Sequence, residues 1–365
     1  MTAEPSPARI APERILIILM GAIGDVVRAL PLLGRLRASW PDAYIAWAVE
    51  PKSAPILERH PWLNELIIYD RHNAPWSFAR FLRQIRRGGF DLTLDLQRHL
   101  KSGIVSMVSR APERLGFASA NTKEFNHRFA TRHIGTQPRM RLKLAQYQAF
   151  GDALGIPTVP IAFGLKLPAE EQARASAFLR EAPRSLVAVI LGSSWPSRIY
   201  FPEMIAAAIK ELAQAREGSA FHPVLLAGPD ERAIADQVML KLKGVPATNL
   251  SGRTGLRDLI GIFGECAVAF GPDSGPMHIA AAVGCPIVSL WGSTAPERSA
   301  PWDNEEFALR GAIPCHPCYL RECPIGRECM RRIDPLEVAK MVRRAAASRG
   351  LEPRAWFAGA ISGTG

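Results

Sequence analysis

The chain of 365 residues carries 45 Lys and Arg against 34 Asp and Glu, a formal net charge of +11, and it is 48% hydrophobic and 22% charged. This balance is typical of a soluble globular protein and excludes a disordered or collagen-like chain. No uninterrupted apolar run reaches the ~18 residues that span a bilayer, and residues 1–14 hold three prolines and no secretory apolar segment. We therefore expect a cytoplasmic protein with enough apolar material for two domains.

The first half of the sequence alternates short apolar runs with helical segments. The isoleucine-rich run Arg14–Met20 and the glycine turn Gly21–Gly24 that follows it are typical of a buried parallel strand. Helices are predicted from Asp25 onward and over Phe78–Arg87. Further strands are predicted at Tyr44–Val49, Leu66–Tyr69 and Leu92–Leu96. This spacing favours a parallel sheet with crossover helices.

The same alternation begins again after a loop predicted over Pro157–Pro168. Strands are expected at Leu186–Leu191, Pro223–Ala227, Val268–Phe270 and Ile287–Trp291. Helices are expected at Glu170–Arg180, Glu203–Arg216, Glu231–Leu242, Leu256–Cys266 and Met277–Val283. The sequence thus predicts two facing Rossmann-like α/β domains with parallel sheets, over residues 1–165 and 166–350, and a tail at 351–365 that can fray.

Most of the net charge lies in one segment, Arg80–Lys143, which has 14 Lys and Arg against 4 Asp and Glu. Such a segment can hold nucleic acid, an anionic membrane or a phosphorylated substrate, and it is also compatible with a solvated basic surface. It contains no nucleic-acid-binding motif, and packing accounts for most of its aromatic residues. We therefore expect no nucleic-acid partner and keep a non-catalytic polyanion-binding protein as the remote alternative.

The turn Gly21-Ala-Ile-Gly-Asp25 follows the first strand and lacks the third glycine of the dinucleotide fingerprint. It places Asp25 at a helix N-terminus beside the carboxyl end of a strand, where open α/β sheets bind ligands. The positive helix end favours the ionised carboxylate, so Asp25 is a candidate base or anion near neutral pH. An ordinary helix N-cap is the structural alternative.

The turn Phe270-Gly-Pro-Asp-Ser-Gly-Pro-Met-His278 lies between a strand and a helix. Asp273, Ser274 and the backbone of Gly275 can cradle a phosphate or sugar hydroxyls at the helix start. His278 lies about one turn into that helix, where it has either a ligand-binding or a structural role. A tight turn is the alternative for the glycine–proline pair.

The turn Gly192-Ser-Ser-Trp-Pro-Ser-Arg198 also follows a strand. Small hydroxyl groups and one forked cation, Arg198, suit the binding of a diphosphate. An ordinary polar loop is the alternative.

The order and spacing of these motifs resemble glycosyltransferase family 9, the ADP-heptose:lipopolysaccharide heptosyltransferases. The likeness runs from Ile15 to about Val342 and is carried by GAIGDVVRALPLL from Gly21, Leu94–Gly103, Arg114–Phe117, Gly192–Pro202, Ala227–Glu231 and Leu250–Thr294. The stretch Cys315–Met330 is similar to one in many heptosyltransferase II-like members. The resemblance implies a GT-B architecture, with the active site in the cleft between two Rossmann-like domains.

The resemblance also implies an activity. It is that of an inverting glycosyltransferase that moves a heptose from ADP-heptose to the phosphorylated Kdo/heptose inner core of lipopolysaccharide. The C-terminal domain would hold the nucleotide-sugar, and the N-terminal domain would present the acceptor at the inner membrane surface, with the enzyme cytoplasmic and peripherally associated. A family 9 transferase that uses another nucleotide-hexose donor is the alternative. The inner-core position and the oligomeric state stay open.

The resemblance assigns roles to individual residues. Asp25 falls on the catalytic base, which takes the proton of the acceptor hydroxyl while the diphosphate leaves. The implied donor-binding residues are Ser194, Arg198, Glu231, Asp273, Ser274, Gly275 and His278. The acceptor-binding candidates are Gln97, Lys101 and Arg114. Arg198 stands where the family usually has Lys, and Ser274 replaces Thr, so both positions keep the chemical group that the reaction needs.

No carboxylate cluster with the spacing of a Mg²⁺ site is evident, so we expect neither a metal nor a cofactor, the nucleotide-sugar being a substrate. Cys315, Cys318, Cys323 and Cys329 give the spacing C-x2-C-x4-C-x5-C. Structural zinc sites usually pair two short knuckles across a longer gap, so a reduced or partly bridged loop is favoured over zinc. Cys266 and Cys285 are predicted to lie in the core.

Overall fold

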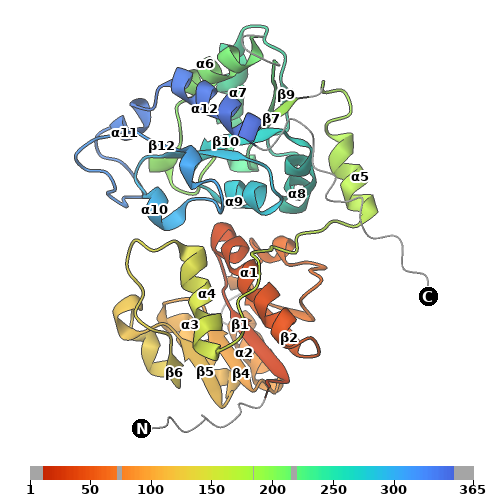
Figure 1. Cartoon of the computed structure of the whole chain (residues 1–365), viewed down its shortest axis with the longest axis vertical. Helices are drawn as coiled ribbons and strands as arrows, with labels where there is room; N and C mark the ends of the chain where they lie inside the picture. The colour runs from red at the N-terminus through yellow and green to blue at the C-terminus, as the bar shows by residue number, and fades with distance from the viewer. Residues whose placement is uncertain (1–10, 72–75, 184, 215–219, 349–365) are drawn as a thin grey trace. The chain divides into compact units, whose positions relative to one another are not determined.

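The computed structural model describes residues 11–71, 76–183, 185–214 and 220–348. It divides into two compact units, Met1–Gly164 and Leu165–Gly365, each built around a six-stranded sheet (Figure 1). The strand orders are β3-β2-β1-β4-β5-β6 and β12-β11-β10-β7-β8-β9, and every strand pair is parallel. Both sheets thus follow the Rossmann order 3-2-1-4-5-6. The prediction of two Rossmann-like domains is confirmed, whereas the predicted tail at 351–365 lies outside the described residues.

The first unit alternates strands and helices along the chain. Its elements are β1 (Arg14–Ile18), α1 (Ile23–Ser39), β2 (Tyr44–Val49), η1 (Ala54–Ile56), β3 (Glu65–Ile68), α2 (Trp76–Arg87), β4 (Leu92–Asp95), α3 (Leu100–Ser109), β5 (Glu113–Gly116), η3 (Ser119–Asn121), η4 (Asn126–Phe129), β6 (Arg132–His133) and α4 (Lys143–Leu154). The four predicted strands are present within two residues of their predicted bounds. The sequence analysis missed β5 and β6 because they are short and polar and lie at the edge of the sheet.

The second unit repeats this arrangement. Its elements are α5 (Ala169–Ala177), β7 (Leu186–Ile190), η5 (Pro196–Arg198), α6 (Pro202–Ala213), β8 (His222–Leu226), η6 (Pro229–Glu231), α7 (Arg232–Leu242), β9 (Thr248–Asn249), α8 (Leu256–Glu265), β10 (Val268–Pro272), α9 (Gly275–Ala282), β11 (Ile287–Trp291), α10 (Pro296–Ser299), η7 (Glu305–Phe307), β12 (Ala308–Arg310), α11 (Glu328–Arg331) and α12 (Pro335–Ser348). All four predicted strands and all five predicted helices are present. The helix predicted to reach Arg216 ends at Ala213, and residues 215–216 lie outside the described part.

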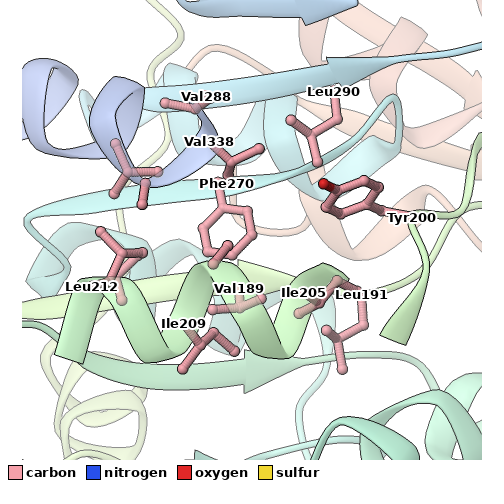
Figure 2. Packing of buried hydrophobic residues seen from close by; sticks show 14 of the residues in the cluster. Val189, Leu191, Tyr200, Ile205, Ile209, Leu212, Phe270, Val288, Leu290 and Val338 are labelled. Atoms are coloured by element: carbon pink, nitrogen blue, oxygen red, sulfur yellow. The ribbon is translucent and has the colours of Figure 1, made fainter. Parts of the chain in front are cut away.

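The core of the second unit is closed by α6 and α12 (Figure 2). Strands β7, β10 and β11 contribute Val189, Phe270, Val288 and Leu290, and the two helices contribute Ile205, Ile209, Leu212 and Val338. The strands are buried on both faces, which explains their unbroken apolar sequences. A close-packed core of this kind fixes the strand ends, from which the polar turns of the unit project.

The first unit depends on a buried arginine that joins α1 to α4. The side chain of Arg35 is only 3% exposed. Its guanidinium donates to the carbonyl oxygens of Gln148, Ile156 and Pro157 and to the carboxylate of Asp152. A Cβ atom at Gly151 would lie 2.7 Å from this guanidinium, so the close approach of α4 to Arg35 requires a glycine there. Among the described helices, none is both long and apolar enough to cross a bilayer.

We expect Arg35→Ala to lower the free energy of unfolding of the first unit by about 3 kcal/mol, because three carbonyl oxygens lose a buried charged donor. Urea denaturation followed by circular dichroism measures this loss. Arg86→Ala, which changes an exposed arginine on α2, should stay within about 0.5 kcal/mol of the wild type. Equal stability of the two variants would contradict the bracing role of Arg35.

Candidate functional site

Asp25 lies in the first turn of α1, just beyond β1, at the point where the strand order of the first sheet reverses. Its carboxylate accepts hydrogen bonds from Lys143 Nζ, at 2.6 Å from Oδ1 and 2.9 Å from Oδ2. Arg28 Nη2 donates to Oδ1 at 2.7 Å. The helix N-cap is Ala22, and Asp25 is the third helical residue. The alternative in which Asp25 is an ordinary N-cap is therefore wrong.

The charge state of Asp25 follows from two opposing effects. Burial disfavours the carboxylate and by itself raises the pKa, but the charges and hydrogen bonds of Lys143 and Arg28 outweigh it and hold the pKa well below its usual range. Burial also raises the pKa of Tyr147, and the charge of Asp25, to which the phenol hydrogen-bonds, raises it further. Asp25 is therefore ionised and Tyr147 neutral at physiological pH.

Two of these partners come from α4 and were missed by the sequence analysis. Lys143 and Tyr147 are four residues apart, so they lie one turn apart on the same face of the helix. That face packs on α1. Lys143 is 118 residues from Asp25 in the chain, and its position inside a basic segment hid its individual role. A lysine and a tyrosine spaced i and i+4 at the start of a predominantly uncharged helix were the available signal.

The end of β4 supplies the neighbouring turn. Gln97 Nε2 donates to the Gly21 carbonyl oxygen at 3.2 Å, which joins this turn to the glycine turn before Asp25. Asp95 is 3% exposed and accepts hydrogen bonds from Ser102 Oγ, Asn126 Nδ2 and the Gln97 backbone N–H, at 2.8–3.0 Å. Burial raises the pKa of Asp95 to about 7, although the three hydrogen bonds oppose this rise.

The other two acceptor candidates, Lys101 and Arg114, lie on different elements of the first unit. Lys101 is exposed at the start of α3, with its ammonium 5.0 Å from the centroid of the Tyr69 ring. Arg114 lies in the amino-terminal half of β5, where its guanidinium donates to the carbonyl oxygens of Phe129 and Ala111. Arg114 thus braces two backbone segments, and the structure does not bring it to Asp25. Its assignment to the acceptor stays an untested prediction.

Arg98 is a residue that the sequence analysis did not select. Its guanidinium lies 4.1 Å from the centroid of the Phe117 ring and donates to Gln146 Oε1 on α4. Its charge lowers the pKa of Tyr147, against the larger effects that raise it, so Arg98 lies electrostatically near the Asp25 cluster. Arg98, Arg28 and Lys143 together make this edge of the first sheet cationic.

In the second unit, Arg198 and Asp273 form an ion pair beyond β7 and β10, which flank the point where the strand order reverses. Arg198 Nη1 lies 3.1 Å from Asp273 Oδ2, and both side chains are largely buried. Thr294 Oγ1 donates to the same carboxylate oxygen at 2.7 Å, and Ser193 Oγ donates to the Asp273 carbonyl oxygen at 2.8 Å. The guanidinium of Arg198 stacks on the Trp195 ring at 4.0 Å from its centroid. The structure thus brings Arg198 and Asp273 together, as a shared site requires.

The start of α9 adjoins this ion pair. Ser274 is the N-cap of α9 and Gly275 its first residue. The Ser274 hydroxyl is buried and hydrogen-bonds to no other described group. A buried polar group without a partner at the positive end of a helix is a ready contact for an anion. His278, the fourth of the eight residues of this helix, is 3% exposed.

Glu231 reaches the same edge of the sheet from the turn after β8. Its Oε2 accepts a hydrogen bond from the Gly228 backbone N–H at 2.8 Å. A Cβ atom at Gly192 would lie about 2.0 Å from this carboxylate, so only a glycine allows Glu231 to occupy the space beside the end of β7. Ser194, two residues further along the β7 turn, is exposed. The ends of four neighbouring strands, β8, β7, β10 and β11, thus place polar side chains along one edge.

Residues 78–328 match the family model described as glycosyltransferase family 9 (heptosyltransferase). The chain belongs to glycosyltransferase family 9. It is 25% identical over 296 residues to the lipopolysaccharide core heptosyltransferase OpsX of Haemophilus influenzae, covering 80% of this chain and 83% of that protein. It is 26% identical over 355 residues to lipopolysaccharide heptosyltransferase 1 of Pseudomonas aeruginosa, covering 89% of this chain and 96% of that protein.

Solved structures share the fold of this family 9 glycosyltransferase. A family 9 glycosyl transferase from Veillonella parvula superposes with a TM-score of 0.77 at 20% identity, covering 92% of this chain and 97% of that one. The ADP-heptose lipopolysaccharide heptosyltransferase II of E. coli superposes with a TM-score of 0.72 at 19% identity, covering 92% and 99%. The fold class is therefore GT-B, as the sequence resemblance implied.

The cysteine-rich segment of this glycosyltransferase braces the turn that carries Arg198. The Ser197 backbone N–H donates to the Arg321 carbonyl oxygen at 3.1 Å, and Ser197 Oγ donates to that of Leu320 at 2.6 Å. Arg327 Nη1 donates to the Ile199 carbonyl oxygen at 2.8 Å. The segment between β12 and α11 therefore holds both sides of η5 in place.

All six cysteines are free thiols. Burial raises the pKa of the Cys329 thiol, and the nearby Cys323, Cys315 and Cys318 raise it further. Within the described ranges, no group of three or more His, Cys, Asp or Glu side chains is arranged to hold a metal ion. Cys266 and Cys285 are buried, as predicted.

The raised pKa of Asp95 implies that the free energy of unfolding depends on pH. Between about pH 4 and pH 7 the unfolded chain has lost this proton while the folded chain keeps it, so stability falls as the pH rises. Over that window we expect Asp95 to cost about 4 kcal/mol of unfolding free energy, a loss that Asp95→Asn abolishes. The contribution of Asp25 lies outside the window, because its lowered pKa matters only below about pH 4.

Urea denaturation of the two proteins at pH 4.5, 6 and 7.5 measures this difference. The wild type should lose stability relative to Asp95→Asn as the pH rises. Parallel curves for the two proteins would show that the buried Asp95 carboxyl does not titrate in this window.

Proposed function

We propose that this family 9 glycosyltransferase transfers a heptose from ADP-heptose to the phosphorylated Kdo/heptose inner core of lipopolysaccharide, with inversion at the anomeric carbon. The observation that carries the proposal is the ionised Asp25 carboxylate at the end of β1, in a chain whose relatives are heptosyltransferases. An acceptor of this kind is anchored in lipid, so the enzyme works in the cytoplasm at the inner membrane surface. It needs neither a metal nor a cofactor.

The second unit is the proposed donor-binding domain. A diphosphate needs cations and N–H or O–H donors, and Arg198, the buried Ser274 hydroxyl and the start of α9 supply them along one edge of the sheet. Glu231 suits the ribose hydroxyls, because a carboxylate accepts hydrogen bonds from a vicinal diol. Asp273 aligns Arg198 and, with Ser194 and His278, completes the proposed donor site. The fold of this chain is similar to that of an E. coli heptosyltransferase whose structure was solved with ADP.

The first unit is the proposed acceptor domain, and Asp25 is the proposed base. The acceptor hydroxyl gives its proton to Asp25, its oxygen bonds to the anomeric carbon, and the electron pair of the breaking glycosyl bond leaves with ADP. Arg198 and the start of α9 stabilise the charge that develops on the departing diphosphate. Gln97, Lys101 and Arg98 line or adjoin the edge that holds Asp25, where an anionic acceptor meets cations.

The two cations that contact Asp25 must be partly displaced before its carboxylate can act as an effective base. A carboxylate held far below its usual pKa is a weak base, so a full complement of ion pairs opposes proton transfer. A phosphate of the acceptor competes with Asp25 for Lys143, because both are anions within reach of the same ammonium. We therefore propose that acceptor binding draws Lys143 away and raises the proton affinity of Asp25 when the substrate is in place.

Replacing Lys143 by methionine should raise the pKa of Asp25, because the effect of burial is then opposed by fewer charges. Burial is the largest single cause acting on this carboxylate and raises its pKa, whereas Lys143 is the largest cause that lowers it. Without Lys143 the pKa of Asp25 rises, so the base becomes protonated in acid. We expect kcat/KM of Lys143→Met to fall steeply on the acidic side of the pH profile, where the wild type shows no loss from Asp25.

Two variants control this experiment. Asp25→Asn should lose about 10²–10⁴-fold in kcat at every pH, as the loss of a general base does. Lys340→Met, which removes an exposed lysine on α12, should keep the wild-type profile. An unchanged acidic limb in Lys143→Met would overturn the coupling of Lys143 to the base.

The donor site is tested by calorimetric binding of ADP, UDP and GDP. We expect ADP to bind best, and Arg198→Ala to weaken it about 10–100-fold, since one charge-assisted contact to phosphate is worth about 1.5–3 kcal/mol. Arg332→Gln, an exposed arginine of the same unit, should bind ADP like the wild type. A preference for UDP would contradict ADP-heptose as the donor and favour another nucleotide-hexose. Unchanged ADP binding by Arg198→Ala would show that this residue does not bind the donor.

A further inference from the structure

Helix α2 presents a stripe of one tryptophan and three arginines to solvent. Trp76, Arg80, Arg83 and Arg87 are spaced four, three and four residues apart, so they share one face of the helix. Phe81 and Ile85, buried against the sheet, lie on the opposite face. All four stripe residues are exposed, and Trp76 is 83% exposed. An indole with so little packing is unusual in a folded domain that does not use it.

The arginines of the stripe also line a recess. Arg80, Arg83 and Arg87 surround a space of about 590 Å³ together with Arg14. Arg14 is fixed there by a hydrogen bond from Nε to the Gly88 carbonyl oxygen at 2.7 Å. The carboxylate that lines this recess, Glu65, accepts hydrogen bonds from Gln84 and from the Tyr44 hydroxyl. The recess therefore has a strong excess of positive charge and room for a phosphate group.

Among the described residues, no partner gives the three arginines of the stripe a structural role. Within the described part of the chain, none of Arg80, Arg83 and Arg87 forms an ion pair or a hydrogen bond. Other arginines of the same basic segment, such as Arg114 and Arg132, are engaged with backbone carbonyls or a carboxylate. The positive charges of the stripe therefore have no role in stabilising the described part of the fold.

The neighbouring helix adds apolar side chains to this surface. Helix α3 packs beside α2, and both cover the same face of the first sheet. Leu100 and Met107 of α3 are seven residues apart, so they lie on one face, and they are 42% and 48% exposed. A surface that mixes arginines with an exposed indole and aliphatic side chains matches the interface of an anionic bilayer, where phosphates lie beside acyl chains.

We infer that the outer face of α2 and α3 docks on the surface of an anionic phospholipid bilayer. The arginine stripe binds lipid phosphates, one of which the Arg14 recess accepts, while Trp76 and Leu100 enter the headgroup region. Trp76 and Leu100 begin their helices just after β3 and β4, at the carboxyl edge of the sheet that also holds Asp25. A membrane on this face therefore brings lipid-anchored acceptors to that edge. The inference rests on the proposed function only in choosing lipid as the partner.

Flotation of the full chain with vesicles tests the inference without donor or acceptor. Vesicles of phosphatidylcholine with 30% phosphatidylglycerol are compared with pure phosphatidylcholine at rising salt concentration. We expect binding only to the anionic vesicles, with loss at high salt. The triple variant Arg80→Gln, Arg83→Gln, Arg87→Gln should lose about 100-fold in partition coefficient, given the usual contribution of a basic side chain near an anionic surface. Trp76→Ser should lose several-fold more than Trp302→Ser, a tryptophan of the second unit.

A second triple variant removes the same charge elsewhere. Arg332→Gln, Lys340→Gln and Arg344→Gln neutralise exposed side chains of the second unit and should float like the wild type. Equal losses in the two triple variants, or no wild-type binding to anionic vesicles at low salt, would overturn the inference. So would equally tight binding of a duplex oligonucleotide that the α2 triple variant abolishes, since the face would then be a general polyanion surface. ADP binding by the α2 triple variant should be unchanged, which separates this test from that of the proposed function.

Discussion

A largely buried carboxylate in the first turn of α1 constrains how α1 and α4 pack in the first unit. Burial disfavours the charge of Asp25, and two cations must be present to keep it ionised. One, Arg28, comes from the next turn of the same helix, but the other, Lys143, requires α4 to be docked on α1. The hydrogen bonds of Arg35 and the missing side chain at Gly151 secure that docking. The charge state of Asp25 therefore depends on packing contacts further along both helices.

The second unit also pairs a carboxylate with a cation beyond the central strands of its sheet. Its ion pair, Arg198 with Asp273, also lies beyond the two central strands of a 3-2-1-4-5-6 sheet. The carboxyl ends of strands on either side of the reversal diverge, so their turns leave room for charged side chains to meet. In both units the structure pairs a charged group of the proposed site with a group of opposite charge. In the proposed reaction, a ligand that takes over one partner of either pair releases the other, which would link ligand binding to reactivity.

The sequence predicted what depends on local pattern. Strands such as β1, β7 and β10 are largely apolar runs. Asp25 and Arg198 lie within eight residues of the ends of β1 and β7, and Asp273 directly follows β10, so their places in the fold could be foreseen. Lys143 could not, because its contact with Asp25 depends on the docking of a helix 118 residues away. Arg114 shows the reverse: its residue type and segment suggested a ligand, whereas the backbone around β5 engages its guanidinium. Short edge strands such as β6 likewise form because a neighbouring strand pairs with them, which no local pattern records.

The basic segment shows why net charge alone could not assign a partner. Some of its cations differ in what they contact. Arg132 is paired with the carboxylate of Glu113, whereas the guanidinium of Arg114 is held by backbone carbonyl oxygens. Lys143 is paired with the carboxylate of Asp25. The stripe on α2 is exposed, and within the described residues no carboxylate is paired with it, so it contributes directly to the attraction toward a distant anionic surface. The surface proposed to bind the membrane and the edge proposed to hold the catalytic base are therefore different parts of the first unit.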